Sequence, residues 1–83
     1  MRYVIMRREI SKYLVSKISC DHLFKKIEGL EDQEIVLDFL LVYYVSNEFI
    51  DAYIANRAMS TKIIIEKNMP MTMKKLLDNA FLN

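Results

Sequence analysis

One stretch, Glu34 to Tyr53, constrains the fold of this chain more than any other. It opens with an apolar, partly β-branched run, Ile35 to Val45, that only Asp38 interrupts. Such a run is typical of a strand that is buried on both faces. After Ser46 the apolar residues recur at the helical spacing of three and four: Phe49, Ile50, Tyr53 and Ile54. The stretch therefore predicts a long buried strand, a short connection and a helix.

Ser46 marks the expected start of that helix. Its hydroxyl can accept a hydrogen bond from a free amide of the first helical turn. Glu48 and Asp51 lie early in the helix, where the positive end of the helix dipole favours carboxylates. Functional surfaces of α/β proteins gather at the carboxyl ends of strands and at the helix starts that follow. We therefore expect the functional surface to lie between Asp38 and Asp51.

The remaining segments predict an alternation of strands and helices. In chain order they are a strand at residues 2–6, a turn with a short edge strand at 13–15, a helix at 19–29, a strand at 62–66 and a helix from Pro70 to Ala80. The segment before Val15 has a second interpretation, because Ile10, Tyr13 and Leu14 also fit one helical turn. Ser19 is expected to cap the first helix, and Gly29 to take the left-handed conformation just past its end. The predicted fold class is α/β, a small sandwich with a mixed, mostly parallel sheet of about four strands and about three helices.

Composition and charge narrow the class of protein. The 83 residues make one domain, and 53% of them are hydrophobic, which is high for so small an interior. Some apolar surface is therefore expected to be covered by a partner or by a second copy of the chain. The net charge of +1 gives nucleic-acid binding no support. The single cysteine, Cys20, indicates a reducing cytoplasm, and no apolar run reaches the ~20 residues of a membrane helix.

The residue pattern does not predict catalysis, a metal site or a cofactor. His22 is the only histidine, and its neighbours Cys20 and Asp21 leave a helix in different directions, so they do not make a ligand set. Glu48 and Asp51 share a helix face and could act as an acid pair, but no nucleophile or base is spaced to work with them. We expect no enzymatic activity and no bound cofactor.

Three further polar positions have alternative interpretations. Asp38 could be a functional carboxylate, or it could accept hydrogen bonds from loop amides and fix the turn before the helix; we favour the second. Ser46 could be phosphorylated, but helix capping alone explains a serine there. Tyr43 and Tyr44 are adjacent, so one of them is expected to need a polar partner, solvent or another protein.

A central motif is formed by residues at defined offsets: Ile35-Val36-Leu37-Asp38-Phe39, Val42, Val45-Ser46 and Phe49-x-Asp51. This motif resembles the STAS-like family, a poorly characterised group related to anti-sigma-factor antagonists, whose pattern reads roughly V-L-D-F-x-G-V-x-x-I-S-x-S-F-A-D-E. Further agreement is found at Ser16-Lys17, at Leu23 to Ile27 and at Asn68 to Leu77. The resemblance covers roughly Leu14 to Ala80. It implies a STAS-like sandwich in which Asp38, Phe39 and Phe49 are structural.

The chain also departs from the family pattern. Leu41 replaces the glycine after Asp-Phe, and Glu48 replaces the second serine. Ile50 and Ala52 replace the alanine and the glutamate around Asp51. In anti-sigma-factor antagonists a partner kinase phosphorylates a serine at the start of this helix, which switches binding off. A carboxylate cannot be phosphorylated and mimics part of the charge of a phosphate, so switching by a serine phosphate is not expected here.

The resemblance implies a non-catalytic cytoplasmic regulatory module that binds another protein through the start of the Ser46 helix. The implied partner is a histidine-kinase-like ATPase or an anti-sigma factor. The residues expected to contact it are Tyr43, Tyr44, Ser46, Asn47, Glu48 and Asp51. One alternative is a structural homodimer, or a subunit of a larger complex, without a switch, which the high apolar content suits. The other is a small enzyme or ligand-binding domain.

Overall fold

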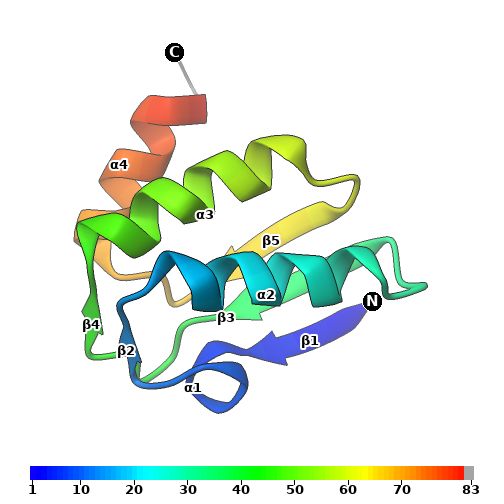
Figure 1. Cartoon of the computed structure of the whole chain (residues 1–83), viewed down its shortest axis with the longest axis horizontal. Helices are drawn as coiled ribbons and strands as arrows, with labels where there is room; N and C mark the ends of the chain where they lie inside the picture. The colour runs from blue at the N-terminus through cyan, green and yellow to red at the C-terminus, as the bar shows by residue number, and fades with distance from the viewer. Residues whose placement is uncertain (82–83) are drawn as a thin grey trace.

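The computed structural model of the protein describes residues 1–81. In chain order its elements are β1 (Arg2–Ile5), α1 (Met6–Glu9), β2 (Tyr13–Leu14), α2 (Lys17–Glu28), β3 (Glu34–Asp38), β4 (Tyr44–Val45), α3 (Asn47–Met59), β5 (Ile63–Lys67) and α4 (Met71–Phe81). The strands form two sheets (Figure 1). One sheet has three strands in the order β1-β3-β5, and the other pairs β2 with β4. The predicted α/β class is confirmed.

The sheet architecture differs from the prediction in two respects. We expected one mixed sheet of about four strands, whereas both sheets are parallel throughout. The expected edge strand near Tyr13 is present as β2, but it pairs with β4 and does not join the main sheet. The chain also turns into the short helix α1 at Met6, which is buried. Pairing between distant segments decides how the strands divide into two sheets, and local sequence patterns do not encode that pairing.

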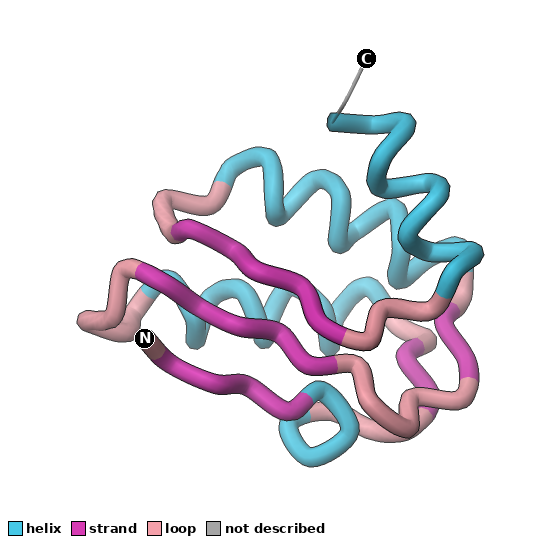
Figure 2. The backbone as a smooth tube through the Cα atoms, turned by 180° about the vertical axis from the view of Figure 1, so that it is seen from behind, coloured by secondary structure: helices cyan, strands magenta, loops and turns pink. Residues whose placement is uncertain are grey.

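Helices α2 and α3 lie side by side on one face of the three-stranded sheet (Figure 1). Figure 2 shows the opposite face, where the strands lie in front of both helices. Side chains alternate between the two faces of a strand, and those of Val4, Ile35 and Leu37 are buried on the helix side. Tyr3 and Ile63 point to the other face, and about half of each side chain is exposed.

The apolar run predicted as one strand is in fact two strands joined by a loop. β3 ends at Asp38, whose Oδ1 atom accepts hydrogen bonds from the Leu40 amide (2.9 Å) and from Asn68 Nδ2 (3.0 Å). Leu41 then adopts a positive φ of 61°, a left-handed conformation outside the extended region. Hydrophobicity alone does not distinguish one long strand from two short ones, because this break depends on side-chain bonds to the backbone and to a distant residue.

The helix starts agree with the sequence pattern at α3 and disagree with it at α2. Ser46 caps α3 as predicted, because its Oγ accepts a hydrogen bond from the Phe49 amide (3.0 Å). The cap of α2 is Ser16 and not Ser19: the Ser16 Oγ accepts the bond, and the Ser19 amide donates it (3.2 Å). Gly29 follows α2 with a φ of −81°, so the left-handed conformation expected there is not observed.

An aromatic cluster fills the space between the main sheet and its two helices. The buried Tyr53 ring of α3 lies 5.4 Å from Phe24, 6.0 Å from Phe39 and 6.5 Å from Phe49, measured between ring centroids. Aromatic pairs of this kind add roughly 0.5–1.5 kcal/mol beyond the burial of their area. The cluster fixes α3 against the sheet, and therefore fixes the place at which α3 starts.

Candidate protein-interaction surface

The starts of α2 and α3 lie beside each other, directly beyond the β2–β4 sheet (Figure 1). In that sheet Tyr13 pairs with Tyr44. The chain passes from β4 into α3 through Ser46, whose amide donates to the Leu14 carbonyl (2.8 Å). The Ser46 hydroxyl donates to the Val15 carbonyl (2.5 Å). The small sheet therefore holds the two helix starts together at one end of the molecule.

Glu48 makes a contact that its sequence position does not reveal. Its Oε2 atom accepts a hydrogen bond of 2.7 Å from the backbone amide of Lys17, the first residue of α2. A carboxylate is favoured at the free amides of a helix start by the hydrogen bond and by the helix dipole. Glu48 therefore lies where an anion would bind at α2, and it joins the two helices.

Further polar contacts join α2 to α3 next to Glu48. Asp21 accepts hydrogen bonds from Lys17 Nζ (2.5 Å) and from Asn56 Nδ2 (2.8 Å). These bonds lower the pKa of Asp21, with Lys17 having the larger effect. The same side chains and Asp51 line an open groove between the two helices. Asp51 is exposed, so it presents its charge to solvent at this surface.

Three exposed tyrosines lie on the small sheet and directly before it. Tyr13, Tyr43 and Tyr44 are 56%, 61% and 54% exposed. The rings of Tyr13 and Tyr43 meet edge to face with centroids 6.2 Å apart, and Lys12 Nζ lies 5.4 Å from the centre of the Tyr43 ring. The sequence pattern points to Tyr43 and Tyr44 but not to Tyr13 or Lys12, because only the pairing of β2 with β4 brings these residues together.

The structure brings the expected contact residues into one region, but it exposes them unequally. The exposed ones are Tyr43, Tyr44, Asn47, Glu48 and Asp51. Ser46 is partly buried, and its hydroxyl both accepts the Phe49 amide and donates to the Val15 carbonyl. A phosphate on Ser46 would break the bond to Val15. Phe39 and Phe49 are buried core residues, as a structural role requires.

Asp38 lies at the carboxyl edge of the main sheet and is partly buried. It accepts the loop amide of Leu40, which is the type of bond predicted from the sequence. The hydrogen bond from Asn68 and then that from Leu40 lower the pKa of Asp38, and the positive charges of Lys67 and Arg7 add to the effect. The carboxylate is therefore held ionised, and it fixes the loop between β3 and β4.

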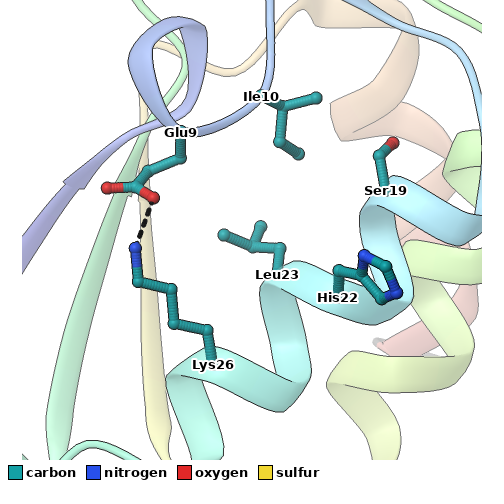
Figure 3. Close-up of a pocket in the computed structure, with 6 residues that line it drawn as sticks. All are labelled: Glu9, Ile10, Ser19, His22, Leu23 and Lys26. Carbon is teal, nitrogen blue, oxygen red and sulfur yellow. Dashed lines mark hydrogen bonds and ion pairs between the residues drawn. The ribbon is translucent and has the colours of Figure 1, made fainter.

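A shallow pocket of about 360 Å³ lies between α1 and α2. Figure 3 shows the residues that line it: Glu9, Ile10, Ser19, His22, Leu23 and Lys26. The Lys26 ammonium pairs with Glu9 at 2.8 Å, so the two charges neutralise each other. The Ser19 hydroxyl donates to the Ser16 carbonyl (2.9 Å) and not to His22. The lining residues thus offer no activated nucleophile.

Comparisons with known proteins identify no relative: no protein-family model, no curated protein and no solved structure matches this chain. Within residues 1–81, no group of three or more histidine, cysteine, aspartate or glutamate side chains is arranged to hold a metal ion. Each helix in that part of the chain is too short or too polar to cross a lipid bilayer. The function must therefore be inferred from the surface described above.

Proposed function

We propose that this protein is a non-catalytic cytoplasmic regulatory module that binds another protein through the surface around the start of α3. The observation that carries the proposal is the cluster of exposed tyrosines beside that helix start, here called the tyrosine patch (Tyr13, Tyr43 and Tyr44). Tyrosines supply large anchor areas in interfaces, and charged residues at the rim influence partner choice. Glu48 and Asp51 provide such charges.

The resemblance to the STAS-like family supports a histidine-kinase-like ATPase or an anti-sigma factor as the partner. In the related anti-sigma-factor antagonists, the regulated serine lies at the corresponding helix start, at about the position of Glu48. One further observation supports the resemblance. The family pattern has a glycine at position 41, and Leu41 has a φ of 61°, a conformation that glycine adopts easily and leucine does not.

The charge of Glu48 has two possible roles: it mimics a permanent serine phosphate, or it is part of the surface that the partner recognises. If its charge mimics a phosphate, a partner that prefers the unphosphorylated form binds more tightly when the charge is removed. Glu48→Ser removes the charge but also the bond to the Lys17 amide. Glu48→Gln keeps an acceptor oxygen for that amide and removes the charge alone. If the acidic residues are themselves recognised, Glu48→Lys weakens binding, and added salt weakens binding to the wild type.

The test has two stages. A tagged wild type and a Tyr43→Ala/Tyr44→Ala variant are compared in pull-downs from native lysate, with partners identified by mass spectrometry. The purified partner is then titrated calorimetrically against both, against Glu48→Gln, and against Met59→Ala as a control. Met59 is 84% exposed at the opposite end of α3. We expect the double variant to lose roughly tenfold or more in affinity and Met59→Ala to bind normally. Equal affinity of all variants would contradict the proposal.

A further inference from the structure

We infer that the tyrosine patch, together with Leu40 and Leu41, also binds a second copy of this chain, so that the free protein forms a two-fold dimer. The tyrosine patch is also the surface that we propose binds a partner protein. The dimer would therefore mask the partner-binding surface until a partner displaces the second copy. This masking rests on the proposed function, whereas the dimer itself does not.

The loop before β4 presents two large apolar side chains, one of them on a residue with a strained backbone. Leu40 and Leu41 are about half exposed, and Leu41 has a φ of 61°. The loop is fixed by the bond from the Leu40 amide to Asp38 and by that from the Val42 amide to the Phe39 carbonyl (3.0 Å). A strained, exposed residue in a well-held loop is typical of a binding site. A glycine at position 41 would suit the backbone better, and the Leu41 side chain is half exposed, which agrees with a contact outside the monomer.

The leucines and tyrosines are close together in the chain and across the small sheet. Leu40 and Leu41 are separated from Tyr43 and Tyr44 only by Val42, which packs against the core. Tyr44 in turn pairs with Tyr13 on β2. Side chains of register partners in a sheet lie on the same face. Monomeric proteins rarely expose large contiguous apolar patches, and such patches mark interaction sites.

The charges around the patch fit a second copy of the same surface. Lys12 precedes Tyr13 at the start of β2, whereas Glu48 and Asp51 follow β4 past its end. Lys17 lies beside these two carboxylates, but its ammonium is paired with Asp21, so this end of the patch remains acidic. Because β2 and β4 are parallel, both run from the basic end of the patch to the acidic end. A two-fold axis perpendicular to the strands makes the strands of the two copies antiparallel. Each Lys12 then faces the carboxylates of the other copy. Lys12, Glu48 and Asp51 are all exposed and can make these contacts.

The size of the patch predicts a weak dimer. Complete burial of a tyrosine removes roughly 150–250 Å² from water, and the tyrosines of the patch are already about half covered. With the two leucines, both copies together would bury on the order of 1,000 Å², which is the lower limit for specific interfaces. We therefore expect a dissociation constant in the micromolar range, which a partner of higher affinity could overcome.

The open face of the main sheet is the rival dimer surface. Figure 2 shows the strands of this face in front of the helices. Tyr3 and Ile63 are exposed on it. Its centre, however, is covered by its own side chains: Lys67 Nζ lies 5.2 Å from the centre of the Tyr3 ring, and Val36 is only 1% exposed although the helices lie on the opposite face. The tyrosine patch has one comparable contact, Lys12 over the Tyr43 ring, but each of its three tyrosines remains more than half exposed. A substitution at Ile63 serves as the matched control.

The test is sedimentation equilibrium of the full chain over low to high micromolar concentrations. We expect a monomer–dimer equilibrium that Lys12→Glu and Asp51→Lys each weaken roughly tenfold or more. The double variant Lys12→Glu/Asp51→Lys restores one opposite-charge pair between the copies but leaves Glu48 facing the new glutamate. It is therefore expected to associate more tightly than either single variant and less tightly than the wild type. Leu41→Gly is expected to weaken the dimer while raising the melting temperature of the monomer by several degrees. Ile63→Thr is expected to leave association unchanged.

Two results would overturn the inference. A wild type that remains monomeric at every concentration excludes the dimer, and partner binding by Tyr43 and Tyr44 would then still be tested by the titrations described above. Dissociation by Ile63→Thr, with no effect of Lys12→Glu, would place the interface on the open sheet face. If the dimer forms as expected, but partner titrations at concentrations where the chain is monomeric show no effect of the tyrosines, the proposed function fails and the dimer stands.

Discussion

Glu66 is the residue on which the contacts between α3 and the main sheet converge. Its side chain is 15% exposed. It accepts hydrogen bonds from the Tyr53 hydroxyl (2.7 Å), from Arg57 Nε (2.6 Å) and from Arg57 Nη2 (3.1 Å). Arg57 also lies over the Phe81 ring at 5.0 Å and so connects this group to α4. The sequence around Glu66 does not predict these partners, because Tyr53 and Arg57 belong to α3, another element.

Glu66→Gln removes the charge of this group and keeps an acceptor for Tyr53. Because the ion pair with Arg57 is largely shielded from water, we expect the free energy of unfolding to fall by about 2 kcal/mol. Urea denaturation measures this loss. Glu31→Gln is the matched control, since Glu31 is exposed. If both variants lowered the free energy of unfolding by the same small amount, the Glu66 contacts would not contribute measurably to stability.

Asp38 is a second residue whose role can be tested alone. Asp38→Asn removes the charge and leaves an oxygen that can still accept the Leu40 amide. The carboxylate is only partly buried, so water screens its interactions with Lys67 and Arg7. We therefore expect a loss of about 1 kcal/mol in unfolding free energy. A thermal melt that coincides with that of the wild type would show that the loop does not depend on this carboxylate.

At the scale of elements, local patterns predicted the helices better than the strands. The start of α3 follows from apolar spacing and from one capping serine, Ser46, both of which are local. The end of β3 does not, because it depends on contacts of Asp38 with Asn68, a residue of another segment. The cap of α2 was misplaced because Ser16 and Ser19 both suit a helix start, and only the backbone geometry distinguishes them.

Ser46 gives the element-scale prediction. Ser46→Ala removes the cap at the Phe49 amide and the bond to the Val15 carbonyl. We expect a loss of about 1–2 kcal/mol in unfolding free energy and faster amide hydrogen exchange at Phe49. Ser46→Asp keeps a capping acceptor and should recover most of the protection at that amide. Unchanged exchange in the alanine variant would mean that packing alone holds the first turn of α3.

At the scale of the whole molecule, the alternation of strands and helices was sufficient to predict the α/β class. It was not sufficient to predict that β2 and β4 would form a sheet of their own. The candidate surface depends on that second sheet, because it places Tyr13 beside Tyr43 and Tyr44. For this reason the prediction from the sequence included only part of the surface and did not include Tyr13 and Lys12.

The pH dependence of stability is also a property of the whole molecule. On the acid side, hydrogen bonds lower the pKa values of Asp21 and Asp38. For Glu28, partial burial opposes the shift, but bonds from Ser60 and Thr61 outweigh it, and the pKa falls. The unfolded chain therefore binds these protons more readily than the folded protein. Stability from these groups is complete above about pH 5, past the unfolded-state pKa values of about 4, and is lost progressively as the pH falls.

On the alkaline side the shifts have the opposite sign. Burial raises the pKa of the Cys20 thiol to about 12. Burial, followed by the charge of Glu66, raises the pKa of Tyr53 well above its usual value. Both groups therefore stabilise the fold while they are protonated. Their contribution is complete below the unfolded-state pKa values, about 8.5 for cysteine and about 10 for tyrosine, and is lost as the pH rises beyond them.

We therefore expect the melting temperature to be highest between about pH 5 and pH 8 and to fall on both sides. Cys20→Ala should remove the part of the alkaline fall that begins near pH 9, and Tyr53→Phe the part that begins near pH 10. Both variants are expected to be less stable than the wild type at neutral pH, so the slope of melting temperature against pH is the quantity to compare. An alkaline slope that neither variant reduces would show that other groups, such as the paired Lys17 ammonium, dominate the transition.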